Sequence, residues 1–147
     1  MGGMRMKNNQ EIELLNTWLS ITNIQANINH ELEMVLQENY KLSLKEFYVL
    51  YFLSQTDDKQ LRLQQLQEMI GLSQSALSRL VGRLEAKSCG ALQRHICEDD
   101  RRGIYTRLTP LGEEKLDRAL QTFYQVLQSI LGKEHLQREF HFLMGKI

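Results

Sequence analysis

The sequence predicts a mainly α-helical fold with one small β-hairpin, and three observations lead to that expectation. One proline and nine glycines in 147 residues leave long stretches without a helix breaker. In most of these stretches, apolar residues recur every three or four positions, which is the spacing of an amphipathic helix. Two short runs, residues 92–97 and 104–108, have the length and apolar content of strands, and a charged link joins them.

The first forty residues predict one long helix, and a second helix follows after a short break. The first covers residues 11–38, and the second starts at Ser43 and continues through Leu53. Ser43 and Glu46 have the spacing of a capping box, in which each side chain bonds the backbone N–H of the other residue. The apolar stripe of the first helix consists of Ile12, Leu15, Leu19, Ile24, Ile28, Leu32 and Val35.

The centre of the chain predicts two short helices separated by a tight turn. Residues 63–70 end at Gly71, a residue type that often terminates helices, and Ser73 caps a helix that runs to about Lys87. Two short helices that share one core in this way are typical of a helix-turn-helix. The apolar side chains spaced to form that core are Leu66, Ile70, Leu72, Leu77, Leu80 and Leu84.

The other face of the second short helix predicts contacts with DNA. Gly82 lies on this face and would let the helix approach DNA closely. In a major groove, Gln pairs with adenine, Arg with guanine, and Ser with several base edges. The residues expected to read bases are Gln74, Ser75, Ser78 and Arg79. Those expected to hold phosphates are Ser73, Arg83 and Arg101.

The charged link between the two strands predicts an exposed tip that also contacts DNA. It spans residues 98–103 and contains Arg101 and Arg102, cations of the kind that a narrow minor groove attracts. Asp100 lies two residues before Arg102 and is placed to hold its guanidinium by a charge-assisted hydrogen bond. A helix-turn-helix followed by such a hairpin is a winged helix-turn-helix.

The distribution of charge supports this interpretation, although the net charge is zero. Residues 1–40 carry two basic and five acidic groups, a net charge of −3. Residues 62–107 carry eight basic and five acidic groups, a net charge of +3. The positive charge is therefore concentrated in the segment that would face phosphates.

The last two predicted helices, together with the first, indicate a homodimer. One begins at Thr109 and Pro110 and runs to Leu131, and the other covers residues 134–146. Such long helices carry more apolar surface than a small central lobe can cover, and a second copy of the chain would cover it. We therefore expect an intertwined homodimer, with dimerisation helices in residues 1–40 and 109–147. The winged helix-turn-helix, the DNA-binding lobe, is expected in residues 41–108.

Two segments together resemble the MarR family of winged helix-turn-helix regulators. The first is the run Leu72-Ser73-Gln74-Ser75-Ala76-Leu77-Ser78-Arg79-Leu80-Val81, followed by Arg83-Leu84-Glu85. The second is Asp100-x-Arg102, five residues, Leu108-Thr109, two residues and Gly112. The order of helices matches the family along nearly the whole chain. One departure is the presence of Ser88-Cys89 before Gly90, with Ala91 where a larger apolar residue is usual. It leaves open the register of the following strand and the role of Arg94.

The resemblance implies a function and an assembly. It implies a homodimer whose recognition helix enters the major groove of double-stranded DNA and whose Arg102 enters the minor groove. It also implies a transcriptional repressor relieved by a small amphipathic or phenolic ligand bound between the lobes.

Two alternative interpretations remain open from the sequence. The zero net charge also fits a winged-helix protein-interaction module without DNA affinity. Cys89 and Cys97 flank the first strand of the hairpin, so oxidation of a thiol there would make the chain a redox-sensing regulator.

Other classes of function receive no support. The sequence contains no recognisable catalytic, phosphate-cradling or zinc-binding motif, so we expect no enzyme activity, cofactor or metal. Two cysteines predict no disulfide framework, which favours a reducing, cytoplasmic location. No apolar run approaches the roughly 18–20 residues that span a bilayer, so we expect no membrane association.

Overall fold

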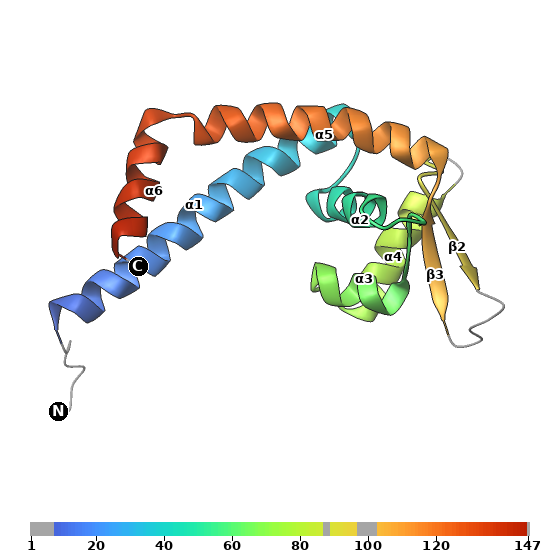
Figure 1. Ribbon diagram of the computed structural model, residues 1–147, viewed down its shortest axis with the longest axis horizontal. Coiled ribbons are helices and arrows are strands. Elements are labelled where there is room, and N and C mark those ends of the chain that lie inside the picture. The colour runs from blue at the N-terminus through green and yellow to red at the C-terminus, as the bar shows by residue number, and fades with distance from the viewer. Residues whose placement is uncertain (1–7, 87–88, 97–102, 147) are drawn as a thin grey trace.

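The computed structural model of the chain describes residues 8–86, 89–96 and 103–146, and the predicted mainly helical fold with a small hairpin is confirmed (Figure 1). The described elements follow in the order α1 (Asn9–Tyr40), α2 (Leu44–Ser54), β1 (Gln60–Arg62), α3 (Leu63–Ile70), α4 (Gln74–Glu85), β2 (Leu92–Ile96), β3 (Ile104–Leu108), α5 (Pro110–Leu131) and α6 (Glu134–Lys146). Among these helices, none combines the length and the apolar character that a membrane crossing requires.

Local sequence signals set the helix ends. Ser43 Oγ accepts from the Glu46 N–H at 3.0 Å, and Glu46 Oε1 accepts from the Ser43 N–H at 2.8 Å, so the predicted capping box is confirmed. Gly71 ends α3 in the left-handed conformation, with φ of 76°. Thr109 caps α5, because its hydroxyl accepts the Gly112 N–H at 3.0 Å.

The sheet contains the predicted hairpin and one further short strand. β2 pairs antiparallel with β3, with Leu92 opposite Leu108 and Ile96 opposite Ile104. β1 pairs with the other edge of β3, which gives the order β1-β3-β2. From its sequence, Gln60–Arg62 was not expected to form a strand, and pairing with β3 makes it one.

The turn between α4 and β2, where the sequence departs from the family pattern, closes on the start of α5. The Ala91 N–H donates to the Leu84 carbonyl at 2.9 Å, and the Ala91 carbonyl accepts from the Thr109 N–H at 3.0 Å. A Cβ on Gly112 would lie 2.2 Å from that carbonyl oxygen, so only glycine fits without a shift. These contacts of Ala91 fix where β2 begins, and hence the register of β2 on β3 that the sequence left open.

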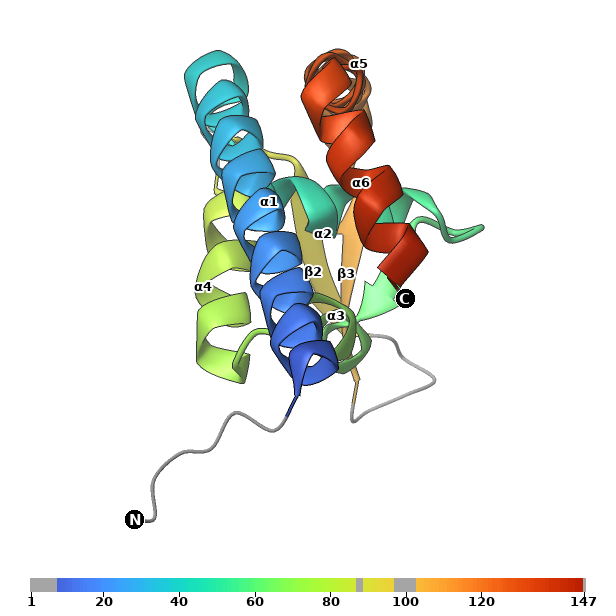
Figure 2. The same ribbon diagram turned by 90° about the vertical axis from the view of Figure 1, so that its left-hand side faces the viewer.

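The hydrophobic core lies in the lobe that contains α2, α3, α4 and the sheet. Its fully buried side chains include Phe47, Leu66 and Leu77. α5 packs on α2 through Phe123, whose ring is stacked on that of Phe47 with centroids 4.8 Å apart. The N-terminal part of α1 and all of α6 extend away from this lobe (Figure 1). They lie in front of it when the molecule is viewed along that extension (Figure 2).

The extension carries large apolar side chains that the single chain does not cover. Trp18 on α1 is 62% exposed, and Phe142 on α6 is 64% exposed. Leu14, Leu15 and Leu19 of α1 are also more than half exposed. In the stripe predicted for the first helix, Ile24 and Leu32 are therefore buried, whereas Leu15 and Leu19 nearer the N-terminus are exposed.

Candidate nucleic-acid interface

Helix α4 presents two chemically different faces. Its inward face consists of leucine and valine side chains that are at most 3% exposed: Leu77, Leu80, Val81 and Leu84. Gln74, Ser75 and Arg79 are exposed on the outward face, and Ser78 is half-buried. Because the inward face is fixed in the core, the direction of the outward face is fixed as well. Its donors and acceptors match the chemistry of base edges.

Ser73 stands at the start of α4, where the sequence places it. Its hydroxyl oxygen accepts from the Ala76 N–H at 3.2 Å, so it is the N-cap of the helix. It also lies 3.4 Å from the hydroxyl of Ser75. Both hydroxyls are exposed at the positive end of the helix dipole, a position that favours a phosphate.

An ion pair joins the hairpin to the C-terminal half of α4. The Arg94 N–H donates to Glu85 Oε2 at 2.7 Å, and Arg94 Nε donates to Glu85 Oε1 at 3.1 Å. Arg94 Nη1 reaches Ser78 Oγ at 3.5 Å, so the guanidinium lies along the side of α4. The backbone N–H of Arg94, together with its guanidinium, lowers the pKa of Glu85 below its ordinary value. This arrangement gives Arg94 the role that the sequence left open, since it holds β2 against α4.

Arg83, expected to hold a phosphate, has a protein partner as well. Its Nε lies 3.7 Å from Glu46 Oε2, and its side chain is 61% exposed. Glu46 belongs to the capping box of α2, so the contact ties α4 to the second helix. Glu46 is buried and Arg83 is largely exposed, so solvent weakens this long ion pair, and the guanidinium remains near the surface.

The predicted hairpin tip lies outside the described residues, and so does Cys97. This concerns Asp100, Arg101 and Arg102, whose roles stay predictions from the sequence. The strands that carry the tip are described up to the pair of Ile96 and Ile104. The base of the wing, as we call the paired strands β2 and β3, therefore has a defined orientation relative to α4 (Figure 1).

The other cysteine, Cys89, lies in the turn between α4 and β2. It is half-buried and forms no disulfide. The ammonium of Lys115 on α5 lies 3.7 Å from its sulfur atom. Cys89 also lines a hollow together with Lys41, Leu111 and Arg118, so small molecules have access to it from solvent.

The arrangement of elements can be compared with known proteins. The sequence model of the MarR family matches residues 40–103, from the last residue of α1 to the position before β3. Over this range the chain is similar to the MarR family. The resemblance inferred from the recognition helix is thereby confirmed over this range. No curated protein sequence matches the chain significantly.

Solved structures extend the MarR-like fold to nearly the whole chain. AbsC, a MarR family transcriptional regulator from Streptomyces coelicolor, is 24% identical with a TM-score of 0.75, over 86% of this chain and 82% of AbsC. Sco3205, a MarR family regulator from the same organism in complex with DNA, is 22% identical with a TM-score of 0.76, over 98% and 89% of the two chains. A mutant MarR from E. coli complexed with operator DNA is 19% identical with a TM-score of 0.70, over 91% and 94%. These likenesses establish the fold.

Two cations next to the MarR-like recognition helix have contacts that were not predicted from the sequence. Arg94 contacts α4, as described above, and Arg62 lines one hollow with Gln74. Both belong to the basic segment, which was the available signal. The direction in which these two side chains point depends on strand pairing between distant residues, and helical periodicity in the sequence does not predict that pairing.

Proposed function

We propose that the chain is a homodimeric, sequence-specific DNA-binding transcriptional regulator, and that it acts as a repressor. The observation that carries the proposal is the outward face of α4. Gln74, Ser75 and Arg79 are exposed there, while the leucines opposite are locked in the core. The recognition helix of a helix-turn-helix docks in the major groove with such a face. The MarR-family match over residues 40–103 supports the same function.

The experiment that tests this proposal is selection of bound sequences from a pool of random DNA duplexes. We expect enrichment of a pseudo-palindrome whose half-sites lie about 10 base pairs apart, because two recognition helices of a dimer meet one face of DNA at that spacing. Absence of binding to any duplex at low salt and micromolar protein would refute the proposal. That result would favour the protein-interaction module suggested by the zero net charge.

Substitution of Arg79 separates base reading from general attraction to DNA. Arg79→Ala should cost about 1–3 kcal/mol of binding free energy on the selected duplex and relax its preference at one base pair. Arg118→Ala is the matched control, because Arg118 is an exposed arginine of α5 that pairs with Glu114. Equal losses in both variants would show that Arg79 acts only through its charge.

The proposed wing contacts rest on the sequence alone. Arg102→Ala should weaken binding and reduce the dependence of the affinity on salt, because one cation fewer displaces counterions from DNA. Asp100→Ala should weaken binding while leaving that salt dependence unchanged, since it removes the partner of the cation and not the cation. A salt dependence unaltered by Arg102→Ala would count against the minor-groove role.

The proposed dimer would cover the apolar extension of α1 and α6. The exposed side chains of Leu15, Trp18 and Phe142 supply the apolar surface that a second copy would bury. Trp18 is the single tryptophan of the chain, so its fluorescence should shift to shorter wavelength as the dimer forms. Trp18→Glu should give a monomer in sedimentation equilibrium. Met69→Glu, a similar change at an exposed methionine of α3, should leave the dimer intact.

We further propose that a small-molecule effector relieves the repression. A hollow of about 390 Å³ lies between α1 and the corner of α5 and α6. Ile24 and Ile130 line it together with Lys133, and the carboxylates of Glu31 and Glu139 line it as well. A molecule with one apolar and one anionic end would therefore have to place its anionic end at Lys133, away from the two glutamates. Benzoate is a suitable probe and should weaken DNA binding, with Lys133→Gln requiring more of it. Equal responses in the two proteins would remove this hollow as the effector site.

Thiol sensing is a second candidate because Cys89 is accessible and close to Lys115. Hydrogen peroxide would oxidise the thiol to a sulfenic acid with release of water. In this case the DNA affinity of the wild type should fall after peroxide treatment, and that of Cys89→Ser should not. Cys97→Ser is tested in parallel. An equal response of the wild type and of the double variant would eliminate this candidate.

A further inference from the structure

Three side chains form one row across the outer face of the sheet, with one residue from each strand. Tyr105 of β3 lies opposite Arg62 of β1 on one side and opposite His95 of β2 on the other. The Tyr105 and His95 rings are stacked, with centroids 5.7 Å apart and an angle of 21° between planes. Arg62 Nε donates to the Tyr105 hydroxyl at 3.0 Å. The arginine side chain is therefore held by a tyrosine that is itself packed in place.

The tyrosine also contacts the arginine through its ring. The guanidinium carbon of Arg62 lies 5.6 Å from the centre of the Tyr105 ring, within the range of a cation–π interaction. An unconstrained arginine loses much of its rotamer freedom when it binds an anion. Here part of that loss has already occurred on folding, so an anion that reaches Arg62 meets a preorganised cation.

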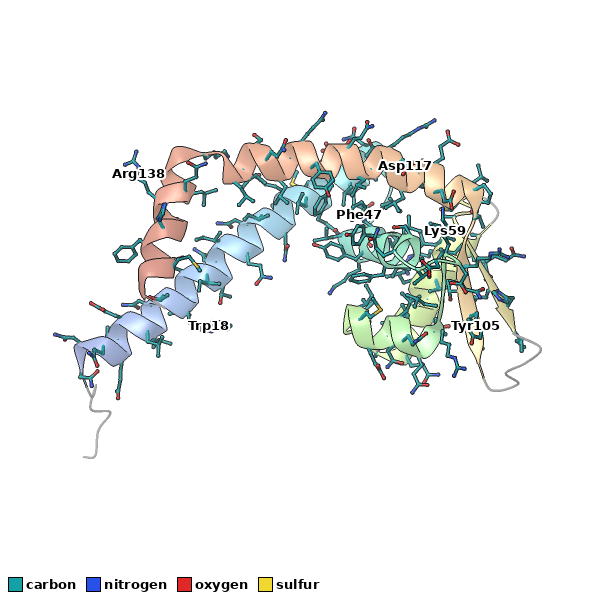
Figure 3. All side chains as sticks on the ribbon, in the orientation of Figure 1. Trp18, Phe47, Lys59, Tyr105, Asp117 and Arg138 are labelled. Carbon is teal, nitrogen blue, oxygen red and sulfur yellow. The ribbon has the colours of Figure 1, made fainter. Side chains whose placement is uncertain are left out.

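Arg62 lies between the two regions proposed to contact DNA, which are α4 and the tip of the hairpin. A hollow of about 270 Å³ is lined by Arg62 and Gln64 near the start of α3, by Gln74 at the start of α4, and by Gly103 next to the hairpin tip. Tyr105 of β3 lies beside α3 in the view with side chains (Figure 3). Arg62 thus occupies the gap between the recognition helix and the wing.

The chemistry of this hollow suits a phosphate. Its described lining consists of one guanidinium, three glutamine side chains, apolar groups and a glycine, with no carboxylate among these residues. Guanidinium and amide groups both donate hydrogen bonds to phosphate oxygens. In helix-turn-helix docking, the first of the two helices crosses the DNA backbone, and Arg62 directly precedes that helix, α3.

We infer that Arg62, preorganised by Tyr105, binds a DNA phosphate between the major-groove contact of α4 and the minor groove reached by the wing. The inference rests on the proposed DNA-binding function and adds a contact residue to it. The contact is to the backbone, so it strengthens binding to every sequence and does not choose among sequences.

The test measures affinity by fluorescence anisotropy at several salt concentrations, for the selected duplex and for a random one. Arg62→Gln should weaken binding to both duplexes about tenfold at moderate salt, the scale of one charge-assisted hydrogen bond. It should also reduce the slope of log affinity against log salt by about 0.9, the value for one phosphate contact. Arg118→Gln, at the exposed arginine of α5, should change neither quantity.

Tyr105→Phe separates positioning from charge. It removes the hydroxyl that accepts from Arg62 and keeps the ring, so we expect a two- to threefold loss of affinity with the salt slope unchanged. In the Arg62→Gln background the same change should have no further effect, because the residue it positions is absent.

The outcomes distinguish this inference from the proposal beneath it. If the wild type binds DNA and Arg62→Gln has the same slope of log affinity against log salt, the inference is overturned and the DNA-binding function stands. A wild type that binds no duplex removes the function itself. Should Arg62→Gln fold poorly by circular dichroism, Arg62→Lys replaces it. Lys keeps the charge but not the fixed geometry, so the slope should remain and the affinity should fall. An affinity of Arg62→Lys equal to that of the wild type overturns the role of preorganisation.

Discussion

Gly82 offers a substitution whose effects on stability and on DNA binding should have opposite signs. It lies inside α4, where glycine destabilises a helix by roughly 0.5–1 kcal/mol relative to alanine. An added Cβ would meet Arg94 Nη2 at 3.8 Å, an ordinary van der Waals distance. Gly82→Ala should therefore raise the free energy of unfolding by about 0.5–1 kcal/mol.

The same methyl group should weaken DNA binding. Gly82 shares the outward face of α4 with Ser78 and Arg79. If that face lies in the major groove, a methyl group there pushes the helix away from DNA. A loss of about tenfold corresponds to 1.4 kcal/mol of binding free energy. Urea unfolding, followed by circular dichroism at one fixed protein concentration, measures the first effect. Anisotropy with the selected duplex measures the second.

Gly145→Ala is the matched control, because Gly145 lies in α6 and an added Cβ would meet open space. Its DNA affinity should equal that of the wild type. Unchanged DNA affinity in Gly82→Ala would refute the placement of this helix face against DNA. Reduced stability in Gly82→Ala would refute the account of α4 packing.

Three further predictions concern stability and pH. Thr106 is fully buried, and its hydroxyl has no hydrogen-bond partner in the part of the chain that the structure describes. Thr106→Val should therefore raise the free energy of unfolding by about 1 kcal/mol in urea titrations. A lower free energy of unfolding would reveal a partner for the hydroxyl. Gly112→Ala should lower it by about 1–3 kcal/mol, because the new Cβ would collide with the Ala91 carbonyl; an unchanged urea midpoint would show that α5 shifts freely. The Glu85 carboxylate, whose pKa is lowered on folding, stabilises the protein above its ordinary pKa of 4.5, and this contribution is lost as the pH falls through the lower folded pKa. The difference in unfolding free energy between wild type and Glu85→Gln should therefore be full at neutral pH and shrink below about pH 4.5, and a difference constant with pH would contradict this account.

The helices could be predicted from the sequence because short-range signals determine their ends. Each of these signals involves a single residue or residues close together in the sequence: the capping box of Ser43 and Glu46, the left-handed Gly71, and Thr109 with Pro110. The inward face of α4 was equally accessible, since leucines at helical spacing are buried whatever they pack against.

The parts that the sequence did not predict depend on contacts between distant residues. β1 has three residues, too few for an alternating pattern to predict a strand, and it is a strand only because it pairs with β3. The contact of Arg94 with Glu85 crosses a turn where the family pattern is interrupted, so its geometry depended on an unknown register. The row of Arg62, Tyr105 and His95 requires both pairings of β3 at once.

The junction between β3 and α5 has a mechanical consequence. Thr109 alone separates the last residue of β3 from the first residue of α5, and its hydroxyl and its N–H donate hydrogen bonds to the carbonyls of Gly90 and Ala91. Because one hydrogen-bonded residue joins them, we expect α5 and β3 to change direction together. A helix of the length of α5 spans about 33 Å. If α5 tilts by about 5° about its end at α6, its end at the wing moves by about 3 Å, the length of one hydrogen bond. A small rearrangement where α5 meets α6 is thereby large enough, at the wing, to make or break a hydrogen bond.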